Sequence, residues 1–156
     1  VYMTWRNFGT NNLYLRQGES LLQYLTACSE RHESYNRIGK TLVRPQHVDI
    51  GRVWTIHHCP LKNGHSFADG DGNEILFRDR DMENLSHHDT HIRINHYFYR
   101  DESYMRYNKL PRVMSRGLSE EQVYEQNRRF MKEKDYRILR LIGQHYLRQW
   151  KSIWQK

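Results

Sequence analysis

Histidine is the residue type in this sequence with the widest chemical potential. The chain has 156 residues and ten histidines, nine of which precede residue 100. An imidazole exchanges its proton near neutral pH and ligates divalent metals, so this enrichment directs attention to metal or phosphate chemistry. His57 and His58 lie at the end of an expected strand, where loops present functional groups. A structural role is the more ordinary interpretation of this pair.

A second cluster, His87 to His91, has the residue types of a metal site but not the spacing. Neither His-x-x-x-His nor Cys-x-x-Cys occurs in it, so a polar loop is the simpler interpretation. His96 lies in the clearest strand pattern, residues 91–98, and shares one face with Ile92, Ile94 and Phe98. We therefore expect His96 to point inward, either as a hydrogen-bonded core histidine or as a metal ligand at the edge of a cleft.

Other chemical motifs are absent or fail on inspection. The run Asp69 to Glu74 has the composition of a calcium loop, but Glu74 stands at the sixth position, where glycine is required, and Arg80 at the twelfth, where glutamate is. A hairpin turn is expected there. No phosphate-binding glycine loop, nucleophile elbow or evident pair of catalytic carboxylates occurs. Cys28 and Cys59 are interpreted as free thiols of a reducing compartment.

The elements that must position these residues come in the order strands first and helices last, which predicts an α+β fold, a small mixed sheet followed by C-terminal helices. Residues 1–18 are expected to be irregular. Ser119 to Gln122 predicts a capping box that opens a helix. Other helices are expected over residues 19–29, 101–116 (with a break near Pro111) and 135–154, strands over 38–44, 52–58 and 91–98, and a hairpin over 65–77.

Positive charge is concentrated in the last third of the chain. The net charge is +7, and from residue 100 onward fourteen lysines and arginines face seven acidic residues, so this third carries the whole excess. Such a segment suits anionic partners: nucleic acid, phosphate groups or an anionic membrane face. In the last expected helix, five apolar residues share one face and four basic residues the other: Leu139, Ile142, Tyr146, Trp150 and Ile153 against Arg137, Arg140, Arg148 and Lys151.

That last helix has two interpretations. It docks on the domain with a solvated basic back, or it lies at a membrane interface with tryptophan at the boundary. No apolar run reaches the roughly 18 residues of a membrane span, and no signal peptide is evident. We therefore expect a cytoplasmic protein, with peripheral membrane contact through this helix as the further expectation.

Several segments in order resemble one family, including residues 19–27, which match a helix of that family. Trp5 to Asn11 is similar to a Trp-x-x-Phe-Gly-(Ser/Thr)-(Asn/Ser) segment, and Lys40 to Pro45, Trp54 to Pro60 and Ile92 to Tyr97 are similar to further segments, the last through an Asn-His-Tyr signature. The family is glycosyltransferase family 92 with its bacterial relatives, which are GT-A-type enzymes. The likeness covers residues 1–116 and weakens towards residue 135. Phe98 to Arg100 stands where the family has Thr-Lys-Ser.

The resemblance implies that residues 1–116 are the acceptor-side, C-terminal part of a GT-A-like α/β glycosyltransferase domain, followed by basic amphipathic helices over residues 117–156. The nucleotide-binding half with its Asp-x-Asp strand would precede Val1. The intact enzyme would transfer a sugar from a nucleotide-sugar donor to a glycan or glycolipid acceptor. The reaction would be inverting and would depend on Mn²⁺ or Mg²⁺.

The resemblance also implies roles for residues. His96 would ligate the metal, and five residues would contact substrate: Trp5, Phe8, His57, His58 and Arg100. For Trp5 and Phe8 a core role is an equally good interpretation, and no catalytic base is assigned. The alternative function is a non-catalytic basic module that binds an anionic polymer or a membrane surface. Specific nucleic-acid binding is not expected, because no recognised motif for it occurs.

Overall fold

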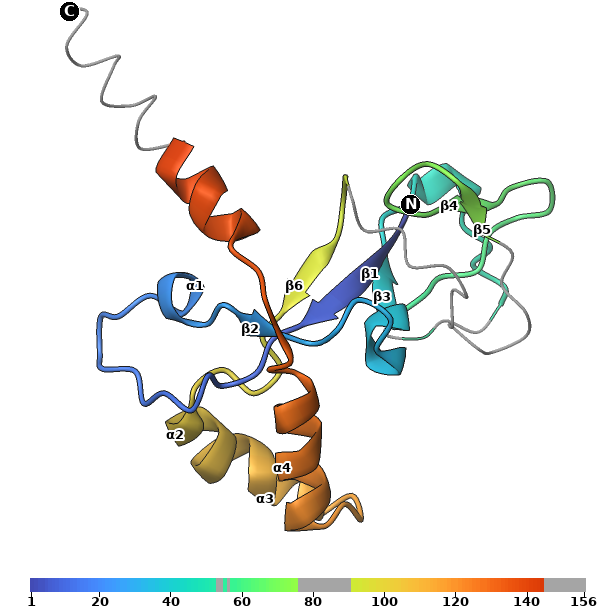
Figure 1. Ribbon diagram of the computed structural model, residues 1–156. Coiled ribbons are helices and arrows are strands. Elements are labelled where there is room, and N and C mark those ends of the chain that lie inside the picture. Colours follow the sequence, from blue (N-terminus) through green and yellow to red (C-terminus); the bar gives the residue numbers. More distant parts are fainter. Residues whose placement is uncertain (53–54, 56, 76–90, 145–156) are drawn as a thin grey trace, which may run out of the picture. The chain divides into compact units, whose positions relative to one another are not determined.

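The computed structural model describes residues 1–52, 55, 57–75 and 91–144 (Figure 1). Its helices and small sheets give the α+β class predicted from the sequence. The chain divides into two units, each taking one early and one later stretch: unit 1 is Val1–Asn7 with Glu30–His96, and unit 2 is Phe8–Ser29 with Tyr97–Lys156. The expected boundary at residue 116 lies inside unit 2. None of the helices within the described ranges is both long and apolar enough to cross a lipid bilayer.

Unit 1 is built on a three-stranded sheet whose central strand is β1 (Tyr2–Asn7). On one side β1 pairs antiparallel with β3 (Gly39–Thr41), and on the other it pairs parallel with β6 (Ile94–His96). The expectation of an irregular segment over residues 1–18 is therefore wrong for its first part. Thr4 and Arg6 occupy inward positions of β1 and are buried, so the strand lacks the apolar alternation that would have revealed it.

The predicted hairpin of unit 1 is confirmed as β4 (Phe67–Ala68) and β5 (Glu74–Ile75). The Asp69 carboxylate accepts bonds from the backbone N–H of Asp71 (2.9 Å) and Asn73 (2.8 Å). Gly72 supplies the left-handed backbone of the turn, with φ at 92°. The described part of unit 1 also contains two 3₁₀ helices, η1 (Ser34–Arg37) and η2 (Pro45–His47).

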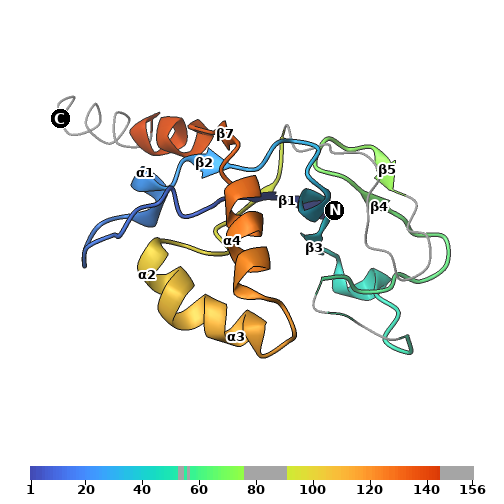
Figure 2. The same cartoon turned by 60° about the horizontal axis from the view of Figure 1, so that its bottom comes forward.

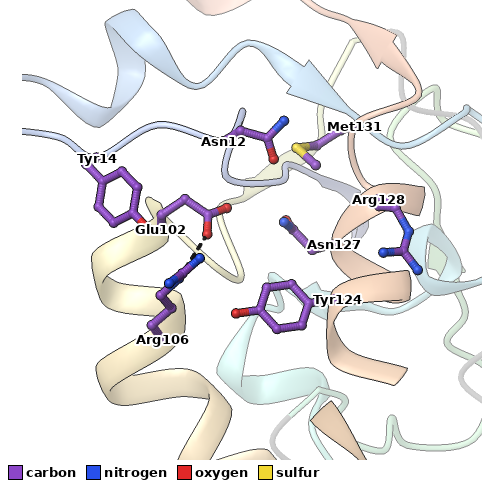
Figure 3. A pocket seen from close by; sticks show the side chains of 8 residues that line it. All are labelled: Asn12, Tyr14, Glu102, Arg106, Tyr124, Asn127, Arg128 and Met131. Carbon is purple, nitrogen blue, oxygen red and sulfur yellow. Dashed lines mark ion pairs between the residues drawn. The ribbon is translucent and has the colours of Figure 1, made fainter. Parts of the chain in front are cut away.

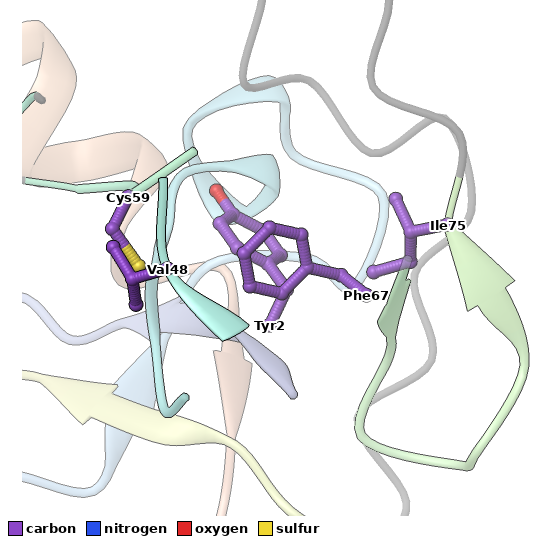
Figure 4. Close-up of a cluster of buried hydrophobic side chains, with 5 residues drawn as sticks. All are labelled: Tyr2, Val48, Cys59, Phe67 and Ile75. Carbon is purple, nitrogen blue, oxygen red and sulfur yellow. The ribbon is translucent and has the colours of Figure 1, made fainter. Parts of the chain in front are cut away.

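The strand expected over residues 52–58 is not present at its described positions. Residues 53, 54 and 56 lie outside the described residues. The Thr55 hydroxyl accepts bonds from the backbone N–H of His57 (3.2 Å) and His58 (3.1 Å). Threonine side chains that bond to nearby backbone compete with strand pairing in this way. The core of unit 1 is a cluster of five side chains, seen in Figure 4: Tyr2, Val48, Cys59, Phe67 and Ile75.

In unit 2, α1 (Leu21–Tyr24) is far shorter than the helix expected over residues 19–29. The chain leaves the helix because the Ala27 N–H donates to the Asn11 side chain (3.0 Å). Residues Ala27–Cys28 then form β2, which pairs antiparallel with β7 (Glu133–Lys134), as Figure 2 shows. Residues 137–144 are helical, in agreement with the start of the last expected helix, whose residues 145–156 lie outside the described part.

The helical run expected over residues 101–116 is confirmed, but without a break at Pro111. It comprises α2 (Glu102–Tyr104), a π-helical turn η3 (Met105–Lys109) and α3 (Leu110–Met114). The wider π turn ends just before Pro111. A proline lacks the N–H of a regular helix and its ring crowds the carbonyl four residues earlier, and a local π turn is one way to relieve both.

Helix α4 (Glu120–Arg129) begins with the predicted capping box. The Ser119 hydroxyl accepts from the Gln122 N–H (3.2 Å), and the Gln122 side chain accepts from the Ser119 N–H (2.7 Å). The core of unit 2 joins α4 to the η3–α3 run through Tyr99, Met105, Val113, Val123 and Phe130.

A close approach of the chain to α4 requires glycine at residue 9. The Gly9 N–H donates to the carbonyls of Phe130 (3.0 Å) and Ala27 (3.2 Å). A β-carbon placed on Gly9 would lie 2.3 Å from the Met131 side chain and 2.9 Å from the Asn127 side-chain oxygen. Both distances are too short for real contacts, so any larger residue at this position must displace the Met131 or Asn127 side chain or the backbone that carries them.

We expect Gly9→Ala to lower the free energy of unfolding by about 1–3 kcal/mol, the usual cost of overpacking a core. Urea denaturation of the variant and the wild type measures this difference. Gly143→Ala is the matched control, because nothing lies within 4 Å of a β-carbon there and the residue is helical. That control should leave stability unchanged or raise it by about 0.4–1 kcal/mol. Equal stability of Gly9→Ala and wild type would contradict the close approach.

Candidate functional site

A network of buried amides in unit 1 ends at His96. The Asn36 side-chain nitrogen donates to the carbonyls of Glu30 (2.8 Å) and Arg31 (3.3 Å). Its side-chain oxygen therefore faces Asn7, from which it accepts both the backbone N–H (3.1 Å) and the side-chain N–H (2.9 Å). Both asparagines are buried. The orientation of the Asn7 amide is thus decided by Asn36, and the Asn7 oxygen is the atom that faces His96.

This orientation selects the tautomer of His96. The Nδ1 atom of His96 lies 2.8 Å from the Asn7 side-chain oxygen, which can only accept a hydrogen bond. The Nδ1 atom must therefore carry the proton, and in the neutral imidazole the lone pair resides on Nε2. An imidazole held in this way is ready to accept a proton or to ligate a cation through Nε2.

Two further predicted residues, Trp5 and His57, gather around the same sheet. The Trp5 ring stacks on the His96 ring, with centroids 3.9 Å apart and an interplanar angle of 22°. It also meets the His57 ring edge-on at 5.1 Å. The His57 Nδ1 atom lies 3.0 Å from the Gly39 carbonyl oxygen, so this imidazole also carries its proton on Nδ1. Strand β1 brings Trp5 and Asn7 to one face, beside β6.

The other predicted substrate residues lie elsewhere. His58, in unit 1, packs near the Phe67 ring (5.7 Å), and burial together with the charge of Arg52 lowers the pKa of its imidazole. Phe8 belongs to unit 2 and is fully buried, so its ring forms part of the interior, 4.7 Å from the Tyr97 ring. Arg100 is also in unit 2, where its guanidinium lies over the Tyr104 ring at 4.5 Å.

The residues of the His96 region do not by themselves form a metal site. Within residues 1–52, 55, 57–75 and 91–144, no three histidine, cysteine, aspartate or glutamate side chains come together as ligands. His96 would supply one nitrogen, whereas Mg²⁺ and Mn²⁺ are held mainly by oxygen atoms. The assignment of His96 as a metal ligand stays a prediction. Of the cluster from His87 to His91, residues 87–90 lie outside the described residues.

A pocket of about 400 Å³ in unit 2 was not anticipated from the sequence (Figure 3). Its walls come from three segments: the loop after Gly9, the α2–η3 run, and α4. The polar side chains on these walls are Asn12, Tyr14, Glu102, Arg106, Tyr124, Asn127 and Arg128. The only hint in the sequence is the spacing of four between Glu102 and Arg106, which places both on one helical face and is common on solvated helices.

Glu102 is buried in this pocket and held by hydrogen bonds. One carboxylate oxygen accepts from the Thr10 hydroxyl at 2.5 Å, and that hydroxyl accepts in turn from the Asn127 side chain at 3.0 Å. Asn127 also accepts from the Thr10 N–H at 3.0 Å. The other carboxylate oxygen lies 3.7 Å from the Arg106 guanidinium. These contacts fix Glu102 and the loop in one arrangement.

Lys109 is the buried cation of the basic segment singled out from the sequence. It is 6% exposed, and its amine lies 3.1 Å from the centroid of the Phe98 ring. Burial and the nearby Arg112 and Arg116 lower the pKa of the Lys109 amine to about 8. The folded unit therefore favours the neutral amine more than the unfolded chain does.

Compared with known proteins, the chain matches no family model, no curated protein and no solved structure.

We expect His96 to populate the Nδ1–H tautomer in the folded chain at a pH above its pKa. A long-range ¹H–¹⁵N correlation spectrum of the imidazoles distinguishes the two tautomers. Asn7→Ala removes the acceptor and should increase the share of the Nε2–H form. Asn63→Ala, at an exposed asparagine, should leave the spectrum of His96 unchanged. An Nε2–H tautomer in the wild-type chain would contradict the amide network.

The low pKa of Lys109 predicts a pH dependence of stability. Between pH 8 and the ordinary lysine pKa of about 10.5, the unfolded chain binds a proton that the folded chain does not. The contribution of Lys109 to stability should therefore fall as pH falls through this window and stay constant below it. Urea denaturation of wild type and Lys109→Met at several pH values isolates the contribution. Parallel profiles for the two proteins would show that Lys109 titrates normally.

Proposed function

We propose that this chain is the acceptor-side part of a glycosyltransferase that moves a sugar from a nucleotide-sugar donor to a glycan or glycolipid acceptor. We likewise propose that the α+β fold is the C-terminal portion of a GT-A-like domain. The first support for the proposal is the resemblance of several ordered segments to the family named above. Two of them contain Trp5 and His96, whose rings stack on each other.

The observation that carries the proposal is the fixed tautomer of His96. A core histidine needs only a hydrogen bond, and either nitrogen serves. Here two buried asparagines orient one nitrogen as a donor, and the Trp5 ring stacks on the imidazole. Asn7 holds the Nδ1 atom and Trp5 holds the plane of the ring, so together they fix the direction of the Nε2 lone pair. Functional imidazoles are commonly oriented by such a second layer of hydrogen bonds.

In the proposed reaction, an acceptor hydroxyl oxygen forms a bond to the anomeric carbon of the donor sugar while the bond to the diphosphate breaks. The proton of that hydroxyl passes to a base that we do not assign. His96 would contact the donor side of this site through Nε2, and His57 would contact acceptor or phosphate. A divalent cation is expected from the family resemblance. No step here depends on it, because the described residues provide a single candidate ligand.

The test is transfer by the native protein with His96→Asn. Asparagine keeps an N–H near the Nδ1 position, so the bond to Asn7 can survive, while the Nε2 atom is removed. We expect transfer, measured as nucleoside diphosphate release and product mass, to fall by about 10–100-fold, the usual cost of losing a group that orients a site. The matched control is His91→Asn, at an exposed histidine that contacts Asp71. It should transfer like wild type.

Two outcomes would contradict the proposal. Unchanged transfer by His96→Asn would remove His96 from the site. Absence of transfer from every common nucleotide-sugar, together with salt-sensitive binding to a polyanion, would favour the non-catalytic basic module instead.

A further inference from the structure

We propose that the pocket of unit 2 binds a neutral saccharide, with Glu102 and Asn12 holding its hydroxyl groups and Tyr14 and Tyr124 contacting its ring. The pocket lies within a single unit and involves none of the residues assigned above. The inference therefore stands or falls independently of sugar transfer. Its volume, about 400 Å³, is at the small end of the roughly 300–1,000 Å³ seen for small-molecule sites.

The charges around the pocket are already balanced, which favours a neutral ligand. The Arg128 guanidinium forms two hydrogen bonds to the Glu125 carboxylate, at 2.9 and 2.6 Å. The Arg106 guanidinium faces the buried Glu102 carboxylate at 3.7 Å. Each cation thus has its own carboxylate, and a phosphate entering the pocket would meet the negative charge of Glu102. An uncharged ligand meets no such repulsion.

Several polar groups on the pocket wall have unused hydrogen-bonding capacity. Among the described residues, no hydrogen bond is made by the side-chain amide of Asn12 or by the hydroxyls of Tyr14 and Tyr124. One oxygen of Glu102 has only the long contact with Arg106. Together they offer an amide and two hydroxyls, which donate and accept, and a carboxylate, which accepts. A sugar, whose hydroxyls also donate and accept, satisfies such a set better than a purely accepting anion.

The two tyrosines supply the apolar contact that a sugar ring also needs. In Figure 3 the Tyr14 and Tyr124 rings lie on either side of Arg106, and Met131 lies on the opposite side of the pocket, next to Asn12. Tyr14 is 55% exposed, and the Arg106 guanidinium lies 5.8 Å from its ring centroid. A tyrosine presents an apolar face and a polar end, so that one residue can contact both the C–H face of a pyranose and one of its hydroxyls.

The pocket is organised before any ligand arrives. The Glu102 N–H donates to the Leu13 carbonyl (2.8 Å), and the Leu15 N–H donates to the Asp101 carboxylate (3.0 Å), so the loop that carries Tyr14 is tied to the start of α2. Asn12 has a left-handed backbone, with φ at 56°, which asparagine tolerates well. Preorganised groups reduce the entropy lost on binding, which matters for a small polar ligand.

The experiment titrates the full chain with neutral methyl glycosides: the glucoside, galactoside, mannoside and N-acetylglucosaminide. Inorganic phosphate and pyrophosphate are titrated in parallel. Amide and arginine side-chain shifts in ¹H–¹⁵N spectra report binding at the pocket. We expect at least one glycoside to shift the signals of Glu102, Arg106 and the loop around Asn12, with millimolar affinity, and phosphate to leave them unchanged.

Variants then assign the contacts. Tyr124→Phe removes one hydroxyl and should weaken glycoside binding about threefold to tenfold, the value of one hydrogen bond. Tyr14→Ala should abolish it. Asn12→Gly deletes the amide without straining the left-handed backbone and should also weaken binding. Tyr107→Phe is the control, at a 78% exposed tyrosine on the same helical run that does not line the pocket.

The outcomes of these titrations distinguish a saccharide site from an anion site. Glycoside shifts that weaken in Tyr124→Phe, Tyr14→Ala and Asn12→Gly but not in Tyr107→Phe support the proposal. Pocket shifts with phosphate alone would assign the site to an anion and overturn it. An absence of pocket shifts with all four glycosides would overturn it as well.

Discussion

The pairing of buried side-chain amides is the interaction on which both units depend. Asn36 joins β1 to the segment after Glu30, 29 residues apart in sequence, and Asn127 joins α4 to Thr10 across 117 residues. Each amide uses its oxygen and its nitrogen, so its orientation is determined. A buried polar group left without a partner costs about 1–3 kcal/mol, so each pair holds distant segments in register. The His96 imidazole and the Glu102 carboxylate both receive their orientation from these amides.

Buried asparagine amides orient a functional group in each unit, but the two groups, His96 and Glu102, suit different chemistry. In unit 1 the amide chain ends on an imidazole and decides which nitrogen keeps its lone pair. In unit 2 it ends, through the Thr10 hydroxyl, on a carboxylate, one oxygen of which is satisfied while the other faces the pocket. The first arrangement suits proton transfer or cation contact. The second suits hydrogen bonds to an uncharged, hydroxyl-rich molecule.

Local signals in the sequence predicted local structure well. The α+β class, the capping box at Ser119 and the hairpin around Asp69 are confirmed, because each depends on residues close together in the sequence. The strand predicted over residues 91–98 is confirmed only over Ile94–His96, where it pairs with β1. The elements that failed depend on distant partners. Strand β1 is stabilised by pairing with β6, which lies far along the chain. The helix expected over residues 19–29 is short because the Ala27 N–H donates to the Asn11 side chain instead of continuing the helix.

The sites were predictable to different degrees for the same reason. The strand alternation singled out His96, and the structure gives it a buried hydrogen-bonding partner. The strand alternation gave no sign that the rings of Trp5 and His57 would lie beside His96. The pocket around Glu102 was not predicted from the sequence at all, because its lining comes from a loop, the start of one helix and a second helix that are far apart in the sequence. Its asparagines and tyrosines have no periodic spacing that would connect them.

The discontinuous make-up of both units has a consequence for how the chain is synthesised. The central strand β1 is synthesised before both of its partners, and its parallel partner β6 comes 89 residues later in the chain. The hydrogen bond between Thr10 and Asn127 can form only later still, because the two residues are 117 positions apart. Contacts between residues so distant in sequence slow folding, since a long loop must close before they form. Until residues 94–96 are made, one edge of β1 therefore has no strand beside it, even after β3 has paired with the other edge. An open strand edge is a state in which a nascent chain needs protection from association with others.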